Sequence, residues 1–189
     1  MKNPNVFIFS GPGGAGKTTL VSRLFAKKTI KASCLKAVTV TTRKKRLNEK
    51  EGVDYFFVNP QEFLYLKNKK FFLESQKVAD NYYGTPKLYY TLAKKKKMNL
   101  ILCIDVKGGL YLKRNLKAGK MITVFITAPS QRELSRRMKK REDGREVLTK
   151  RVALAKEELR YAKQYDFLIT NKDLDAAVKK AEEIIAAHQ

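Results

Sequence analysis

Short apolar runs alternate with segments of helical spacing along most of the chain. Four of these runs lack the strict alternation of a half-exposed strand, which is typical of parallel strands buried on both faces. They cover Val6–Ser10, Leu100–Asp105, Ile122–Thr127 and Phe167–Thr170. Helical spacing covers Gly16–Lys27, Pro86–Lys94, Gly109–Leu116, Pro129–Lys140, Arg145–Tyr161 and Leu174–Ala187. Strands that alternate with helices predict an α/β fold whose core is a doubly wound parallel sheet.

Residues 36–85 break this alternation. They contain short stretches rich in aromatic and β-branched residues, which favour strands, and one short helical segment that begins at a proline. The strands are expected over Ala37–Thr41, Tyr55–Val58, Phe71–Val78 and Tyr82–Thr85, and the helix over Pro60–Leu66. We therefore predict an inserted, mostly β subdomain over residues 36–85.

A second interruption, over residues 139–145, is polar and lies between two basic helices. Such a segment is typical of a mobile lid over a site. The predicted organisation is then a core of residues 1–35, 86–133 and 155–189, with a helical lid of residues 134–154.

The strongest chemical signal is a glycine-rich loop between the first strand and the first helix. Residues 11–18 match the pattern G-x-x-x-x-G-K-T. The glycines let several N–H groups point at one anion, and the following helix adds its positive N-terminal end. Lys17 can reach the outer phosphates of a nucleotide, and the Thr18 hydroxyl can hold Mg²⁺. A glycine-rich turn without function is the alternative, and the flanking elements disfavour it.

The composition is strongly basic, with 41 Lys and Arg against 18 Asp and Glu and a formal net charge of +23. Such a balance favours anionic partners and steers small phosphates onto the protein. The one dense run, Lys94–Lys97, is typical of a solvated surface turn. No nucleic-acid-binding motif accompanies it, so we do not expect nucleic acid as a partner. The sequence carries no signal for the oligomeric state.

The 189 residues fit one domain with small inserted subdomains. The two cysteines, Cys34 and Cys103, lack C-x-x-C spacing, so neither a disulfide framework nor a zinc site is expected. No apolar run approaches the roughly 20 residues of a membrane helix, and the first residues lack the apolar stretch of a signal peptide. We expect a soluble cytoplasmic protein without membrane attachment.

A second group of cations opens the inserted segment, where Arg43 and Arg46 follow several hydroxyl side chains. Tyr55 and Tyr83 come later in the same segment. Arginine binds phosphate in a bidentate fork, so these four side chains can converge on one phosphate. A basic turn with ordinary packed tyrosines fits the same residues.

Further cations lie in the predicted lid. Arg137 and Arg141 share one face of a helix, and Arg151 follows them. Arginines that close over a transferring phosphoryl group stabilise its negative charge, which is worth roughly 10³-fold or more in rate. A solvated basic helix is the alternative.

Over nearly its whole length the chain resembles the guanylate kinases. The matching motifs are G-P-G-G-A-G-K-T-T at 11–19, T-V-T-T-R-x-x-R at 39–46, E-G-V-D-Y at 51–55, Glu74, N-Y-Y-G-T at 81–85, I-D at 104–105 and T-N-K-D-L at 170–174. Each motif after the first is a weak signal, whereas their joint order and spacing are specific. The resemblance implies a P-loop nucleoside monophosphate kinase that uses ATP, GMP and Mg²⁺.

By position, the resemblance also implies the roles of particular residues. It assigns the GMP phosphate to Arg43, Arg46, Tyr55 and Tyr83, and guanine to Thr39, Glu74, Thr85 and Asp105. It assigns ATP to Gly11, Pro12, Gly13, Gly14, Ala15, Gly16, Lys17, Thr18 and Thr19, with Asn171 near the adenine. Thr18 is the implied metal ligand, and the implied catalytic cations are Lys17, Arg137, Arg141 and Arg151.

The assignment of Glu74 to guanine also makes chemical sense. Guanine offers two adjacent donors, N1–H and N2–H₂, and a carboxylate can accept both. Adenine has no such pair, and a site built on hydrogen bonds rejects an analogue that lacks them by roughly 10⁴-fold. Taken alone, Glu74 fits an exposed carboxylate on a strand better, and only the resemblance favours the guanine site.

The chain departs from the family pattern at three places. Cys103 stands where the family usually has the first aspartate of D-x-D, which is expected to support the metal region. Gly13 and Thr39 stand where serine is common, and both changes are mild. The segment Arg141–Arg145 departs from the usual lid sequence.

We expect transfer of the γ-phosphoryl group of ATP to GMP, giving ADP and GDP. The acceptor is already an ionised phosphate, so no strong general base is required. No residue named above reads a ribose 2′-hydroxyl, so dGMP is expected as an acceptor too. Three alternatives stay open: a catalytically inactive guanylate-kinase-like binding module, a nucleic-acid-binding protein with auxiliary NTPase activity, and a kinase for another phosphorylated acceptor.

Overall fold

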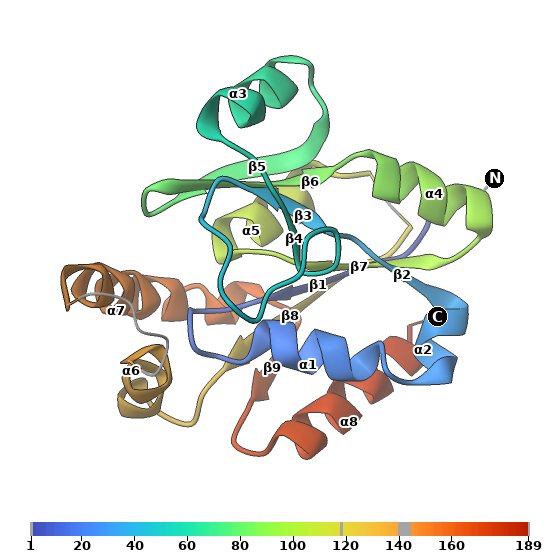
Figure 1. Cartoon of the computed structure of the whole chain (residues 1–189). Coiled ribbons are helices and arrows are strands. Elements are labelled where there is room, and N and C mark those ends of the chain that lie inside the picture. Colours follow the sequence, from blue (N-terminus) through green and yellow to red (C-terminus); the bar gives the residue numbers. More distant parts are fainter. Residues whose placement is uncertain (1, 118, 140–144, 189) are drawn as a thin grey trace.

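The structure is a computed structural model that describes residues 2–117, 119–139 and 145–188, the side chains of 145–147 excepted. A five-stranded sheet lies at the centre of this part of the chain (Figure 1). Its order is β2-β7-β1-β8-β9, and every neighbouring pair is parallel. The strands are β1 (Val6–Ser10), β2 (Cys34–Lys36), β7 (Asn99–Cys103), β8 (Met121–Thr127) and β9 (Phe167–Thr170). The predicted α/β fold with a parallel sheet is confirmed.

Helices cover both faces of this sheet. On one face lie α1 (Lys17–Leu24) and α8 (Leu174–Ala186), and on the other lie α4 (Leu88–Lys96) and α5 (Val106–Asn115). Phe7 and Phe9 of β1 pack into the core on the α1 side, whereas Val6 and Ile8 pack into the core on the α5 side. All four side chains are fully buried. Burial on both faces explains why this run has no polar alternation.

A second, four-stranded sheet has the order β4-β3-β6-β5. Its strands are β3 (Thr39–Thr41), β4 (Tyr55–Phe57), β5 (Phe72–Val78) and β6 (Asn81–Pro86). The β3–β4 pair is parallel and the other two pairs are antiparallel. This sheet lies above the central sheet in Figure 1, and the loop between β3 and β4 extends from it toward α1. The mostly β character predicted for this segment is confirmed.

Helix α3 (Pro60–Asn68) covers the outer side of the second sheet. It begins at a capping box in which Asn59 and Glu62 each accept a hydrogen bond from the other's backbone N–H. Its Phe63 is fully buried and stacks on the rings of Phe72 and Tyr82, with centroid distances of 4.7 and 5.3 Å. These rings hold β5 and β6 together under the helix.

Two further helices, α6 (Gln131–Lys139) and α7 (Arg145–Leu159), pack on one another at the left of Figure 1. A short 3₁₀ turn (Ala162–Gln164) then leads into β9. Helices within the described ranges are too short or too polar to cross a membrane.

The predicted helix over Gly16–Lys27 is wrong at its C-terminal end. Helix α1 stops at Leu24, and a separate helix α2 (Lys28–Ser33) follows, which leads into the unpredicted edge strand β2. In one continuous helix Ile30 would lie about 120° away from the buried face that ends at Leu24. The break lets Ile30 reach the core, where it is 2% exposed.

Two other helix starts also differ from the prediction. Pro86 ends β6, where it pairs with Phe72, and α4 begins only at Leu88. Helix α5 begins at Val106 instead of Gly109, because the Asp105 carboxylate caps it by accepting a 2.9 Å hydrogen bond from the Gly108 N–H.

Candidate active site

The glycine loop connects the end of β1 to the start of α1. Gly11 has φ 143°, and a Cβ there would lie 1.9 Å from the Ile126 carbonyl oxygen of β8. Gly16 has φ 87°, and a Cβ there would lie 2.3 Å from Asn171 Nδ2. A side chain fits at neither position, so both glycines are dictated by the loop. Gly16 also leaves the first N–H groups of α1 without a side-chain cap, and such groups attract anions.

The ammonium group of Lys17 lies inside this loop. Its Nζ donates hydrogen bonds to the Gly11 carbonyl at 2.5 Å and to the Pro12 carbonyl at 3.0 Å. Thr18 and Thr19 follow in the first turn of α1, with exposed side chains. Thr18 and Cys103, the latter at the end of β7, line the same small cavity. Burial raises the pKa of the Cys103 thiol, against the opposing effect of the nearby Lys17 charge.

Asn171 holds the glycine loop from the side of β9. Its Nδ2 donates a 2.8 Å hydrogen bond to the Ala15 carbonyl, and its backbone N–H donates to the Thr127 carbonyl at 2.7 Å. The residue is only 5% exposed. Its side-chain amide is therefore engaged with the loop backbone. The place beside the adenine of ATP that the family resemblance implies for Asn171 stays a prediction.

Helix α6 packs directly on the same loop. A Cβ at Gly14 would lie 3.0 Å from the Leu134 carbonyl oxygen and 3.6 Å from Arg137 Cβ. The Arg137 guanidinium donates to the Asn171 carbonyl at 3.1 Å and to Glu133 Oε1 at 2.8 Å. A predicted catalytic arginine thus lies next to the phosphate loop.

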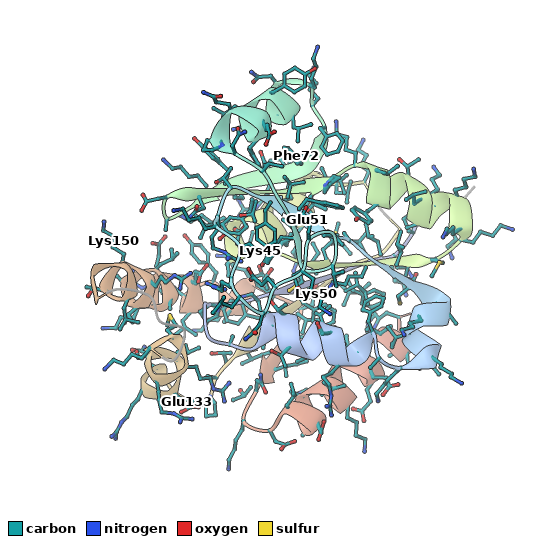
Figure 2. The ribbon with its side chains drawn as sticks, viewed as in Figure 1. Lys45, Lys50, Glu51, Phe72, Glu133 and Lys150 are labelled. Carbon is teal, nitrogen blue, oxygen red and sulfur yellow. The ribbon has the colours of Figure 1, made fainter. Side chains whose placement is uncertain are left out.

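The other two predicted lid arginines follow Arg137 along the chain. Arg151 is half-buried on α7, and Arg141 lies outside the described residues. Figure 2 labels Glu133 on α6 and Lys150 on α7, and it shows the two helices together on one side of the glycine loop.

Four predicted phosphate-binding residues gather at the β3–β4 loop and the second sheet. The Arg43 guanidinium lies 5.3 Å from the centre of the Tyr55 ring, and that ring meets the Tyr83 ring edge-on at 6.2 Å. Arg43 and Arg46 both contact one carboxylate, that of Glu49, at 2.6 and 3.7 Å. The structure therefore brings together two guanidiniums and two phenols, as the sequence predicted.

The predicted guanine-binding residues lie deeper in the same region. Glu74 and Thr85 are paired across β5 and β6, and they are 3% and 0% exposed. Thr85 Oγ1 donates a 2.7 Å hydrogen bond to Glu74 Oε1, whereas Glu74 Oε2 has no hydrogen-bond partner among the described residues. Thr39 is also buried, on β3. A buried carboxylate oxygen without a partner is costly, so such an atom marks a place for a ligand donor.

Asp105 lies beside this carboxylate. A Cβ at Gly108 would lie 2.7 Å from Glu74 Oε2 and 3.1 Å from Asp105 Oδ2, so both oxygens face the same glycine. Burial and the nearby Asp105 charge raise the pKa of Glu74 to about 8, and burial also raises the pKa of Asp105. At neutral pH the ligand-free Glu74 therefore carries a proton for much of the time.

Two carboxylates, the half-buried Glu49 and the buried Glu158, were missed by the sequence analysis. Glu49 is the one acidic residue in the basic stretch 43–50, and that isolation was the available signal. Glu158 lies on the inner face of α7, three residues after the buried Ala155, and is 7% exposed. Burial raises the pKa of Glu158 to about 7. The Lys17 charge acts to lower this pKa, and the Asp105 charge acts to raise it.

The arrangement combines two anion-binding groups with one carboxylate pair. The glycine loop offers amide groups and Lys17, and the second sheet offers arginines, phenols and an unpartnered carboxylate oxygen. Side chains of this kind suit two phosphorylated ligands, one of which carries a base with two adjacent hydrogen-bond donors.

Known proteins resemble this chain over most of its length. The guanylate kinase family model matches residues 3–188. The guanylate kinase of Rickettsia felis is 37% identical over 185 residues, which cover 97% of this chain and 94% of that protein. That of Caldanaerobacter subterraneus subsp. tengcongensis is 38% identical over 186 residues, covering 97% and 87%. The crystal structure of guanylate kinase from Anaplasma phagocytophilum superposes with a TM-score of 0.80 at 28% identity, covering 100% of this chain and 87% of that one. The chain belongs to the guanylate kinase family.

Proposed function

We propose that this protein transfers the γ-phosphoryl group of ATP to GMP, with formation of ADP and GDP. The observation that carries the proposal most is the buried, unpartnered Glu74 Oε2 beside Thr85 and Asp105. An ionised Glu74 accepts the N1–H and N2–H₂ of guanine, and the Thr85 and Thr39 hydroxyls stand nearby for the remaining polar atoms of the base. Adenine lacks these donors and would leave Glu74 unpaired.

The donor nucleotide binds at the glycine loop. The free N–H groups at the start of α1 and the Lys17 ammonium neutralise the phosphates of ATP, and Lys17 exchanges its contacts with Gly11 and Pro12 for phosphate oxygens. Asn171 supports the loop from below through Ala15. Asn171 thus contributes to ATP binding by fixing the shape of the loop.

The acceptor phosphate binds between Arg43, Arg46, Tyr55 and Tyr83. In this position it faces the donor loop, and in-line transfer then depends on positioning and on charge stabilisation. Arg137 supplies part of that charge from α6, and Arg141 and Arg151 are proposed as further lid cations. The acceptor phosphate is already ionised near neutral pH, with a second pKa of about 6, so the reaction needs no strong general base.

The residues present fit a Mg²⁺ ion bound together with ATP. Mg²⁺ in such sites takes one or two protein ligands and otherwise phosphate oxygens and waters. The exposed Thr18 hydroxyl is the proposed protein ligand, and no cluster of three or more His, Cys, Asp or Glu suited to a metal occurs in the described ranges. When bound, the ion neutralises charge on the transferring phosphate.

The proposed division of labour follows the two sheets. Residues 36–85 bind GMP, residues 134–154 form the lid, and the remaining ranges form the core. Closure of residues 36–85 and of helices α6 and α7 over the two nucleotides excludes water and so prevents hydrolysis of ATP. No side chain assigned here contacts a ribose 2′-hydroxyl, so dGMP is proposed as an acceptor. The free thiols of Cys34 and Cys103 suit the reducing cytoplasm.

The test is ADP release by the purified protein with ATP and Mg²⁺, measured with and without GMP. The proposal expects release that depends on GMP, and it expects Lys17→Ala to abolish that release while circular dichroism stays unchanged. Lys95→Ala removes an exposed lysine at the end of α4 and serves as the matched control, with normal turnover expected. GMP-independent ADP release, or normal turnover by Lys17→Ala, would contradict the proposal.

A further inference from the structure

One carboxylate is joined to both arginines of the proposed phosphate subsite. Glu49 Oε1 accepts a 2.6 Å hydrogen bond from Arg43 Nη2, and Glu49 Oε2 accepts a 2.9 Å hydrogen bond from the backbone N–H of Arg46. Arg46 Nη1 lies 3.7 Å from Glu49 Oε1. The side chains of Arg43 and Glu49 are only 11% and 15% exposed, so this pair is sheltered from the screening that weakens surface ion pairs.

Glu49 also shapes the backbone that carries Arg46. Its N–H donates to the Arg46 carbonyl at 3.1 Å, which closes a turn over residues 46–49. The Glu49 carboxylate stabilises the same turn, because it accepts a hydrogen bond from the Arg46 N–H. This turn lies between β3 and β4, outside the strand ladders, so these local bonds fix the position of Arg46. Figure 2 labels Lys45, Lys50 and Glu51 on this loop and shows it in the centre of the molecule.

Three sets of contacts fix the position of the Arg43 guanidinium. Its Nη1 donates to the Lys44 carbonyl at 2.6 Å, and its guanidinium lies over the rings of Tyr55 and Phe57 at 5.3 and 5.8 Å. Glu49 provides the third contact. A bidentate fork recognises phosphate only when its plane has a fixed direction, and these contacts fix it.

Glu49 carries its negative charge at neutral pH. Burial acts to raise the pKa of Glu49, but the hydrogen bonds from Arg43 and from the Arg46 backbone outweigh it and leave the pKa below its ordinary value. The subsite is thus a constant arrangement of two guanidiniums about one carboxylate, and it is complete before any ligand arrives.

We propose that Glu49 is the positioning residue of the acceptor-phosphate subsite. It orders Arg43 and Arg46 during folding, so that binding of the phosphate does not have to immobilise two long side chains. Glu49 does not itself touch the phosphate. The proposal rests on the proposed function, because the subsite has a role only if the acceptor is a nucleoside monophosphate.

The variant Glu49→Gln tests this directly. Glutamine keeps the shape but has one acceptor oxygen, and its NH₂ faces either the Arg43 guanidinium or the Arg46 N–H, which are both donors. We expect the KM for GMP to rise about tenfold or more, because a partly buried, charged hydrogen bond is lost. We expect kcat and the KM for ATP to change by less than about twofold.

Inhibition by guanosine distinguishes a specific loss of phosphate binding from a general loss of folding. It fills the proposed guanine pocket but has no phosphate, so its inhibition constant against GMP should be the same in Glu49→Gln and in the wild type. Glu49→Asp keeps the charge and should restore part of the lost GMP affinity. The matched control is Asp175→Asn, because the Arg23–Asp175 pair has the same 2.6 Å separation but 57% and 78% exposed side chains. It should change none of these constants.

Three outcomes would overturn the proposal. The first is an unchanged KM for GMP in Glu49→Gln. The second is a lower KM for GMP, which would make Glu49 a competitor of the phosphate. The third is a guanosine inhibition constant that rises by the same factor as the KM for GMP. Wild-type protein that turns over no GMP would instead overturn the proposed function, and the role of Glu49 with it.

Discussion

The Thr85 hydroxyl donates a 2.7 Å hydrogen bond to Glu74 Oε1, while the other oxygen of the same carboxylate has no partner among the described residues. Both residues are buried, and β5 and β6 place them opposite one another. One half of the carboxylate is thus fixed in direction, and the other half points at the space next to Gly108 and Asp105. We interpret this as a preorganised acceptor for the paired donors of guanine.

Replacement of Glu74 by glutamine should therefore impair GMP use selectively. The amide has one donor group where guanine also presents donors, so one hydrogen bond is lost and one repulsive contact is formed. We expect kcat/KM for GMP to fall by roughly 10²- to 10⁴-fold, with the KM for ATP within about twofold of wild type. Steady-state kinetics with each substrate varied in turn gives both values.

The matched control for this variant is Glu182→Gln. Glu182 lies on α8, far from β5 in the sequence, and pairs with Lys27. Its neutralisation should leave both substrate constants unchanged. An intact kcat/KM for GMP in Glu74→Gln would remove Glu74 from the guanine site.

The raised pKa of Glu74 predicts a pH dependence of base recognition. In the free protein this pKa is about 8, because of burial and the neighbouring Asp105 charge. Guanine requires the ionised form, so binding releases a proton below that pH, and affinity increases as the pH rises. The dissociation constant of guanosine, which has no titrating phosphate, should fall by about ninefold between pH 6 and 7 and by about fivefold between pH 7 and 8.

Isothermal titration calorimetry at three pH values in buffers of different ionisation enthalpy measures both the affinity and the released proton. Glu74→Gln should bind guanosine weakly and with no pH dependence over this range. A constant wild-type affinity from pH 6 to 8 would mean that Glu74 is already ionised in the free protein or is not in contact with the base.

Asn171 should act through the glycine loop. In Asn171→Asp the carboxylate cannot donate to the Ala15 carbonyl, and two acceptors then face one another in a buried position. The free energy of unfolding should fall by about 1–3 kcal/mol, and the KM for ATP should rise several-fold while the KM for GMP stays the same. Denaturant unfolding and steady-state kinetics measure these effects.

Asn115→Asp is the control for that variant. Asn115 Nδ2 donates a hydrogen bond of the same 2.8 Å length to the Tyr111 carbonyl, but on the exposed end of α5. Stability and both KM values should stay close to wild type there. If Asn171→Asp weakens GMP binding as much as ATP binding, the loop is not where Asn171 acts.

Cys103 offers a test of the metal region. Cys103 lines the same small cavity as Thr18, the proposed Mg²⁺ ligand, and its thiol lies near the Lys17 charge. Cys103→Asp places a carboxylate at that point, which should lower the Mg²⁺ concentration for half-maximal activity several-fold through its added negative charge. Cys103→Asn has the same shape without the charge and should leave this concentration unchanged. Equal behaviour of the two variants would exclude an electrostatic role at this position.

Much of the central sheet could be predicted from the sequence because its signals are local. The run Val6–Phe9 is apolar at every position, and the glycine loop that follows has a fixed spacing. The edge strand β2 could not be predicted in this way. Its three residues pair with β7 from a distant part of the sequence, and three residues carry no periodicity.

The candidate site was harder to predict, since its contacts are tertiary. Glu74 and Thr85 came from the family resemblance, because the pairing of β5 with β6 that makes one face the other is not a property of either segment. Glu49 was missed because its contact with Arg43 depends on the turn at 46–49. The direction of the Asn171 amide likewise follows from the approach of β9 to the glycine loop.

The most direct measurement of the central claim is ADP production by the wild-type protein at fixed ATP and Mg²⁺, with GMP, dGMP, AMP, CMP and UMP offered one at a time. A carboxylate acceptor for paired donors predicts rapid ADP production with GMP and dGMP, and kcat/KM lower by roughly 10⁴-fold for AMP. Comparable rates with GMP and AMP, or no production with GMP, would contradict it.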